Sequence, residues 1–74
     1  MLDKYFLTQI QRKNNEFTKG CVVKDTLDAA RQSFHAYLGA YGYGNDASVD
    51  YVAVCIMSMD GRITDSVVDN RIEE

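Results

Sequence analysis

Proline and tryptophan are absent from this 74-residue chain, histidine occurs once and cysteine twice. The lack of proline and a hydrophobic content of 46% argue against a disordered chain. With His35 as the single histidine, one chain cannot form a metal site or a catalytic pair from two histidines. Cys21 and Cys55 stand alone, without CxxC spacing, so neither a disulfide framework nor a zinc site is predicted. We therefore expect no function that depends on a two-histidine site, a disulfide framework or a zinc site.

The sequence also lacks long apolar runs. No stretch approaches the ~20 apolar residues that a membrane span needs. The first residues, MLDKYFLTQIQRK, are too polar for a signal peptide. We therefore expect a cytosolic protein with no membrane partner. In that reducing compartment Cys21 and Cys55 are expected to be buried free thiols, although the sequence leaves a bridge between them open.

The length allows one small domain, 1–74, whose core supplies only about 3–5 kcal/mol. Self-association is a common remedy for so small a core, so we expect a homo-oligomer. Residues 1–35 carry six basic and four acidic side chains, whereas residues 36–74 carry two basic and seven acidic ones. The net charge of −3 excludes a general nucleic-acid binder but allows a local basic surface.

One helix is predicted, from about Thr26 to Tyr41. Asp25 is the expected cap, and Gly42 or Gly44 is expected to end the helix in a left-handed conformation. Apolar residues recur every three or four positions along it, which predicts one buried stripe. The members of the stripe are Leu27, Ala30, Phe34, Leu38 and Tyr41.

Four strands are predicted around this helix. They are Tyr5–Arg12, Phe17–Lys24, Val49–Met59 and Arg62–Val68. We expect a turn at 13–16, a bulge at Gly20, a two-residue Asp60-Gly61 turn and a frayed tail at 69–74. The order β-β-α-β-β predicts an α+β two-layer sandwich, with one helix on a four-stranded antiparallel sheet. The second sheet face would then stay open and serve as an interaction surface, most simply for another copy.

The glycine–tyrosine run 39–45 is the most unusual stretch of the chain. Its tyrosines either pack on the sheet at the helix end or form a stacking platform for a planar ligand or partner. The run lacks the spacing and the lysine of a phosphate-binding loop. For a platform, we hypothesise a ligand site of tyrosines and nearby basic residues. Its members are Arg12, Lys19, Lys24, Arg31, His35, Tyr37, Tyr41 and Tyr43.

No group of residues specifies a reaction. On a helix, Ser33 and His35 point to different faces and cannot form a nucleophile–base pair. The carboxylates follow neither a calcium-loop pattern nor an acid/base pairing. We therefore expect a protein that is not an enzyme and that needs no metal and no cofactor.

The segment KGCVVKDTLDAARQSFHAYLGAYGYGNDASVDYVAV, residues 19–54, resembles a family of short uncharacterised proteins from phages and mobile elements of gut bacteria. SFHAYLGAYGYGND followed by VDYV is its most specific part. The resemblance covers about half of the chain and transfers no activity to any residue. It implies a standalone protein in the cytosol of a host cell, in a setting where short phage proteins often act in counter-defence.

Two functional hypotheses follow. The first is a sponge that sequesters a nucleotide immune signal at subunit boundaries, with aromatic rings stacking the base and basic groups holding phosphate. The second is an inhibitor of a host defence protein that uses the open sheet face or the acidic C-terminal half. A structural or accessory oligomer without ligand is a third alternative.

Overall fold

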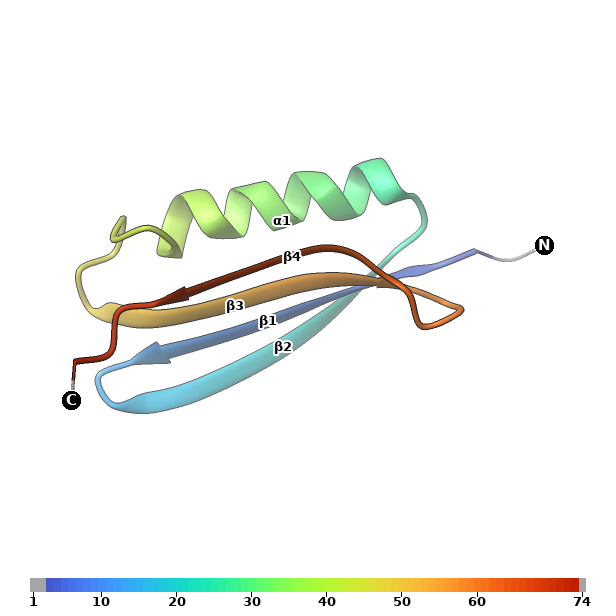
Figure 1. The fold of residues 1–74 in the computed structure, drawn as a ribbon. Coiled ribbons are helices and arrows are strands. Elements are labelled where there is room, and N and C mark those ends of the chain that lie inside the picture. Colours follow the sequence, from blue (N-terminus) through green and yellow to red (C-terminus); the bar gives the residue numbers. More distant parts are fainter. Residues whose placement is uncertain (1–2, 74) are drawn as a thin grey trace.

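The computed structural model describes residues 3–73 (Figure 1). Four strands and one helix follow one another as β-β-α-β-β, and they form a small α+β fold as predicted. The elements are β1 (Tyr5–Lys13), β2 (Glu16–Lys24), α1 (Leu27–Tyr41), β3 (Val49–Ser58) and β4 (Ile63–Asn70). No helix in this part of the chain is both long enough and apolar enough to cross a membrane.

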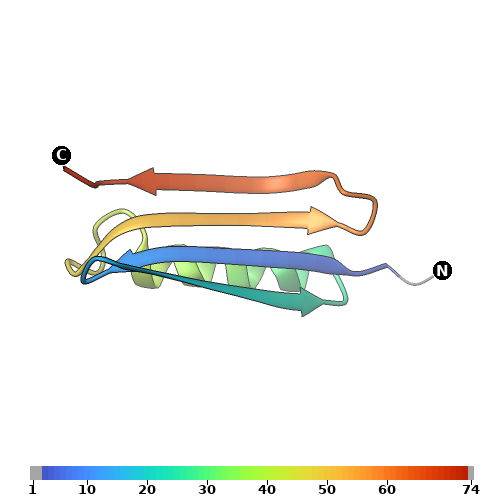
Figure 2. The same ribbon diagram turned by 90° about the horizontal axis from the view of Figure 1, so that it is seen from below.

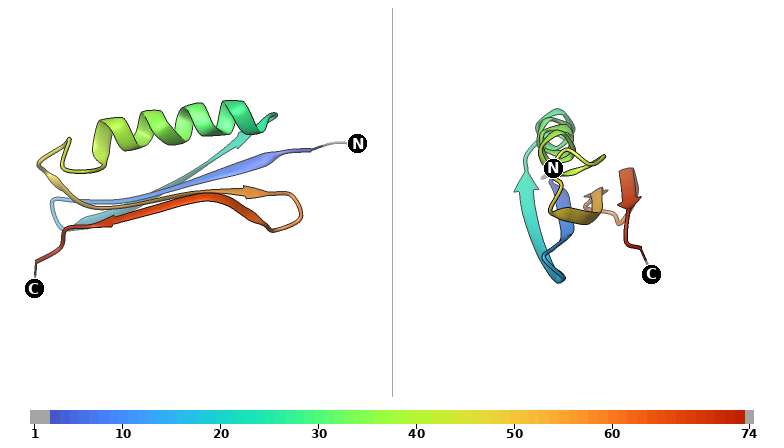
Figure 3. Two further views of the ribbon diagram at one scale, coloured as in Figure 1. Left: turned by 45° about the horizontal axis from the view of Figure 1, so that its top comes forward. Right: turned by 90° about the vertical axis from the view of Figure 1, so that its left-hand side faces the viewer.

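The four strands form one antiparallel sheet in the order β2-β1-β3-β4. The sequence left this order open. The helix lies along one face, over β1, β3 and β2, and β4 extends beyond its cover (Figure 2). The end-on view in Figure 3 shows that the opposite face of the sheet has no covering layer. The molecule is therefore a two-layer sandwich with one open side.

The core lies between the helix and the covered face of the sheet. The helix contributes Ala30, Phe34 and Leu38, and the predicted stripe is confirmed. The central strands contribute alternate residues, which are Leu7 on β1 and Val52, Val54 and Ile56 on β3. The alternation assigns the neighbouring residues of both strands to the open side.

The helix begins one residue later than predicted. Thr26 is the N-cap, because its extended backbone lets the side-chain Oγ1 accept a hydrogen bond from the amide of Ala29 at 3.1 Å. Asp25, the expected cap, instead forms an ion pair with Lys4, which holds the pKa of its carboxyl below the usual value. Asp25 and Thr26 could both cap this helix, but Asp25 pairs with Lys4 and Thr26 is the cap.

The end of the helix combines two glycines with different roles. Gly42 ends the helix in an extended conformation, φ −85°. The prediction of a left-handed residue at this end, Gly42 or Gly44, is therefore wrong for Gly42. A side chain there would meet the carbonyl oxygen of Leu38 at 2.9 Å, so close approach requires glycine. The left-handed residues are Tyr43 (φ 55°) and Gly44 (φ 79°).

The predicted turn between β1 and β2 is confirmed. Asn14 and Asn15 have φ of 53° and 66°, while Lys13 pairs with Glu16. Two left-handed residues in a two-residue loop define a type I′ turn, and asparagine tolerates this conformation better than most residues. The bulge expected at Gly20 does not occur, because Gly20 pairs with Gln9 in an unbroken register.

The turn between β3 and β4 is longer than the predicted two residues. The amide of Ser58 donates to the carbonyl of Arg62 at 2.9 Å, and Gly61, at φ 88°, donates to Ser58 at 3.0 Å. The loop is therefore 59–61, with glycine in the left-handed position typical of three-residue hairpins.

A register shift follows this turn, between Ile56 and Met57. The predicted pairs of Cys55 with Ser66 and Val54 with Val67 are present, but Met57 pairs with Ile63 and not with Thr64.

The tail predicted to fray from residue 69 is ordered at its start. Asp69 and Asn70 belong to β4, and the amide of Arg71 donates to the carbonyl of Asp50 at 2.7 Å. Asp69 also accepts a 2.7 Å hydrogen bond from the amide of Tyr43, so the strand is tied to the loop after the helix. Residue 74 lies outside the described range.

Candidate functional site

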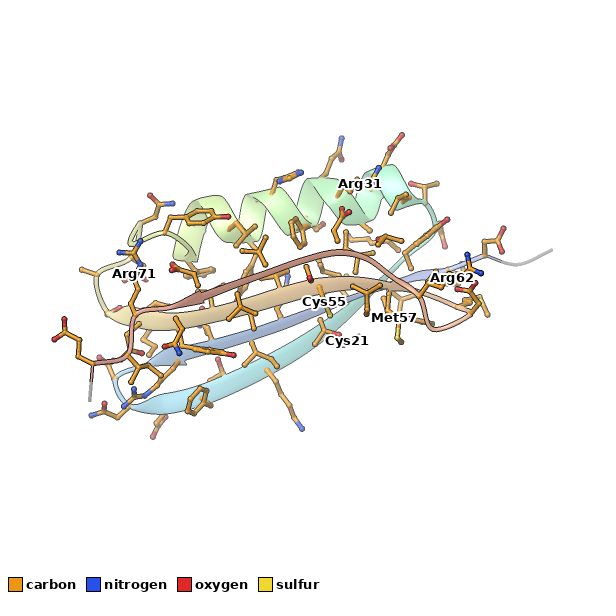
Figure 4. The ribbon with its side chains drawn as sticks, viewed as in Figure 1. Cys21, Arg31, Cys55, Met57, Arg62 and Arg71 are labelled. Atoms are coloured by element: carbon orange, nitrogen blue, oxygen red, sulfur yellow. The ribbon has the colours of Figure 1, made fainter. Side chains whose placement is uncertain are left out.

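The open face is the side of the sheet away from α1, and its side chains form four rows in register across β2, β1, β3 and β4. The rows are numbered from the β3–β4 turn. The first row is Val23, Phe6, Met57 and Ile63, and the second row is Cys21, Thr8, Cys55 and Ser66. The third row is Lys19, Ile10, Ala53 and Val68, and the fourth row is Phe17, Arg12, Tyr51 and Asn70. Met57 and both cysteines are labelled in Figure 4.

Large apolar side chains are exposed on this face. Phe17, Val23, Ile63 and Val68 are each more than half exposed, at 62%, 56%, 52% and 64%. None of the sixteen positions in the four rows carries a carboxylate, and the cations are Arg12 and Lys19. The nearest carboxylate is that of Asp50, which pairs with Arg12 beside the fourth row. An exposed apolar surface of this kind is typical of an interaction site.

The middle of the open face is hollow. The second row carries only small side chains, whereas the first and fourth rows carry most of the large ones. One hollow of about 180 Å³ is lined by Thr8, Cys55 and Ser66 together with parts of the third row. A second, of about 430 Å³, lies beside it over β1 and β2, where Lys19 and Cys21 contribute to the wall. Thr8 and Ile10 of β1 line both hollows, which lie side by side across the strands and are together called the trough.

The fourth row holds the only aromatic cluster of the open face. The guanidinium carbon of Arg12 lies 5.9 Å from the centre of the Phe17 ring, and that ring meets Tyr51 edge-on at 5.8 Å. Arg12 donates to Asp50 at 3.2 Å and to Asn15 at 2.8 Å. Both terminal nitrogens of Arg12 thus bond within the chain, which holds its side chain against the end of the sheet.

The tyrosines of the hypothesised ligand site lie on the opposite side of the sheet. Tyr37 and Tyr41 are half-buried against the core, with ring centres 5.0 Å apart. The hydroxyl of Tyr37 donates to Gln11 at 3.1 Å, and burial raises the pKa of Tyr37 above 10, with Tyr41 adding to the effect. Tyr43 is 58% exposed in the loop after the helix. A platform of three exposed rings does not form.

The predicted basic residues are also divided between surfaces. Arg31 on the helix donates to Asp65 of β4 at 2.9 Å, which raises the pKa of the guanidinium (Figure 4). His35 is exposed on the outer side of the helix. Lys24 occupies a helix-side position of β2, and only Lys19 joins Arg12 on the open face. Within one chain the eight residues do not come together as a site.

Two carboxylates of the acidic C-terminal half are already paired within the chain. Asp65 is paired with Arg31, and Asp69 is paired with Arg71 at 3.0 Å and with the amide of Tyr43. Both carboxylates therefore stabilise the fold on the helix side of β4. Reversing their charge would disturb these contacts as well as any partner, so such variants cannot isolate a binding role.

The two thiols lie on the open face and not in the core, contrary to the prediction. Cys21 is exposed and Cys55 half-buried, and both are free. Thr8 of β1 stands between them in the second row. Two strand spacings separate their Cα atoms by roughly 10 Å, beyond the reach of a disulfide.

From the sequence, Tyr51 and Cys55 are among the residues expected on the open face, whereas Phe17 and the other small residues of the second row are not singled out. Alternation along each predicted strand could have assigned them to one face, but only the strand order places them side by side. In residues 3–73, no three histidine, cysteine, aspartate or glutamate side chains lie close enough together to hold a metal ion. In comparisons with known proteins, no family model, curated protein or solved structure matches the chain.

Proposed function

We propose that the chain is a non-enzymatic binding protein that works as a homodimer, with a second copy covering the open face of the sheet. The observation that carries the proposal is a four-row surface with exposed apolar side chains and no carboxylate. Covering it would add a second apolar layer to a domain whose core has eight buried apolar residues between 3 and 73. The dimer would be a four-layer helix–sheet–sheet–helix sandwich.

The size of the open face supports this partner. Four strands at about 4.8 Å and nine residues at about 3.3 Å give a flat area of roughly 19 by 30 Å, or about 570 Å². Side-chain relief increases the accessible area beyond this projection. A stable interface buries about 600–1,000 Å² on each partner. The whole open face is thus about as large as one standard interface requires.

The charge distribution supports a specific orientation. Sheets that pack face to face align their strands within about 30°. A two-fold axis parallel to the strands, between β1 and β3, stacks β2 over β4 of the partner and each row over the same row. Lys19 then faces Val68 of the partner, and Arg12 faces Tyr51 of the partner. No two like charges are opposed in this arrangement.

A role in sequestration or inhibition stays part of the proposal. In the nucleotide-sponge hypothesis, the ligand would lie where the two chains meet. The face-to-face dimer supplies Arg12 and Lys19 to that boundary but leaves Tyr37 and Tyr41 on the helix side. In the inhibitor hypothesis, a host protein would take the place of the second copy on the same face.

Sedimentation velocity over a wide concentration range tests the homodimer. The expected result is a reversible change from the mass of one chain, 8.4 kDa, to twice that mass. Val68→Lys should shift the association strongly toward monomer, because an unpaired buried ammonium costs several kcal/mol, or roughly a 100-fold or larger increase in Kd. Gln32→Lys, which adds the same charge on the exposed side of the helix, is the matched control.

The outcome that contradicts the proposal is a protein that stays monomeric at every concentration, or a dimer that Gln32→Lys and Val68→Lys affect equally. Native mass spectrometry on protein recovered from cells separates the ligand hypotheses. A dimer with an added mass of nucleotide size supports sequestration. One chain bound to a different protein favours inhibition.

A further inference from the structure

In the proposed dimer the small second row becomes the weak point of packing. Packed sheets lie about 10 Å apart, and side chains from both must fill that gap. Phe6 and Met57 in the first row and Phe17 and Tyr51 in the fourth are long enough to meet their counterparts. Between these rows the cysteine, threonine and serine side chains of the second row are too short to meet.

The trough therefore closes into a chamber when two copies pair. Its walls already leave hollows of about 180 and 430 Å³ in one chain, and the two-fold axis places the trough of one copy over that of the other. Protein interiors are close-packed, and an apolar void loses the contacts that its lining would otherwise make. A ligand that fills the chamber would recover those contacts.

The lining defines the chemistry of such a ligand. The chamber is mostly apolar, with methyl, methylene and thiol groups from Ile10, Ala53 and Cys55. Lys19 lies at its rim and forms no ion pair with any residue between 3 and 73. Because no carboxylate lies in the four rows, the ammonium of Lys19 favours an anion. The symmetry places one Lys19 at each end of the chamber.

We propose that this chamber binds an apolar monoanion, an aliphatic or aryl carboxylate or sulfonate whose apolar body lies along the second row and whose anionic group binds Lys19. The inference rests on the proposed homodimer. It assigns the ligand to the open face and not to the tyrosine-rich loop. A nucleotide, with several charges and a polar sugar, fits this lining poorly because burying polar groups without partners is costly.

Isothermal titration calorimetry with three ligands of equal chain length tests the assignment. Decanoate is the anionic probe, and decanol and decyltrimethylammonium are its neutral and cationic counterparts. Decanoate should bind with a stoichiometry of one or two per dimer and more tightly than either counterpart. Equal affinity for all three would contradict a role for Lys19.

Two lysines on the same strand supply a matched pair of variants. Lys19→Gln should weaken decanoate binding by roughly 10- to 100-fold, the usual effect of losing a charged hydrogen-bond partner. Lys24→Gln, on the helix side of β2, should leave it unchanged. Equal losses in the two variants would overturn the site.

A filling variant distinguishes failure of the chamber from failure of the dimer. Thr8→Leu adds bulk where the two hollows meet, so it should abolish decanoate binding while the protein stays dimeric. A wild-type dimer that does not bind decanoate overturns the chamber and leaves the homodimer standing. A protein that is monomeric with and without decanoate overturns both proposals.

Discussion

Gly39 and Gly44 lie five residues apart and need glycine to different degrees. Gly39 is exposed inside the helix, and a Cβ there would meet no atom within 4 Å. Gly44 has φ 79°, and a Cβ would lie 2.9 Å from a guanidinium nitrogen of Arg71. Gly39 can therefore be replaced without a steric clash, whereas the backbone conformation at Gly44 requires glycine.

Alanine substitutions at these glycines should act in opposite directions. Gly39→Ala should raise the free energy of unfolding by about 1 kcal/mol through helix propensity. Gly44→Ala should lower it by about 1–2 kcal/mol, because an alanine in the left-handed region is strained. Urea denaturation of both variants checks this. The same sign for both would contradict the structure of the glycine–tyrosine loop.

Because of Tyr37, the free energy of unfolding should vary with pH in the alkaline range. Burial raises the pKa of Tyr37 in the folded chain above 10, so its ionisation lags behind that of the unfolded chain. The contribution is constant below the unfolded pKa, and the free energy of unfolding falls as the pH rises from there toward the folded pKa. Tyr37→Phe should make this alkaline fall shallower.

At neutral pH, Tyr37→Phe should also cost about 1 kcal/mol by leaving Gln11 without its donor. Tyr43→Phe, at an exposed ring, is the control and should change neither property. Chemical denaturation from neutral to alkaline pH measures both effects. An alkaline slope that is the same in the wild-type protein and in Tyr37→Phe would contradict the burial of this hydroxyl.

At the scale of elements, the sequence predicted the type and order of all four strands and the helix. The helix was predicted from its period, the buried stripe from Leu27 to Tyr41, and the first strand from the polar alternation after Leu7. The third strand was predicted from a nearly continuous apolar run between Tyr51 and Met57. The ends were less predictable. Asp25 and Thr26 both suit a cap, and only the position of Lys4 decides between them. The length of the β3–β4 loop likewise depends on the bulge beside Met57.

The cap assignment predicts a specific loss. Thr26→Ala should lower the free energy of unfolding by about 1 kcal/mol, because the amide of Ala29 loses its acceptor. Thr26→Ser should retain most of the stability. Asp25→Ala removes only an exposed ion pair and should cost less than Thr26→Ala. If the alanine variant at position 25 is the more damaging one in thermal denaturation, the assigned cap is wrong.

At the scale of the molecule, an open sheet face was predictable because one helix cannot cover both sides of a sheet. The composition of that face was only partly predictable. Tyr51, Ala53, Cys55 and Met57 form one face of β3, as alternation implies. The neighbours that complete each row come from β2 and β4, and their positions depend on the strand order β2-β1-β3-β4. For the same reason, the hypothesised site of tyrosines and basic residues could not be assembled from their proximity in sequence.

The orientation of the dimer predicts that an acidic and a basic substitution at Val68 weaken it to different degrees. Val68 should face Lys19 of the partner across the two-fold axis. Val68→Glu should therefore weaken the dimer less than Val68→Lys, since the carboxylate can pair with that ammonium. In the Lys19→Gln background the difference should shrink. Dissociation constants from sedimentation equilibrium check both statements, and equal weakening by Glu and Lys would reject this axis.

The most direct measurement of the central proposal is the rate at which Cys21 and Cys55 react with a thiol reagent as protein concentration rises. Both thiols lie in the second row of the open face, Cys55 on the central strand β3 and Cys21 on the edge strand β2. If a second copy covers that face, both rates should fall together over the concentration range in which the mass doubles. Rates that stay constant while the dimer forms would show that the copies meet elsewhere and would contradict the proposal.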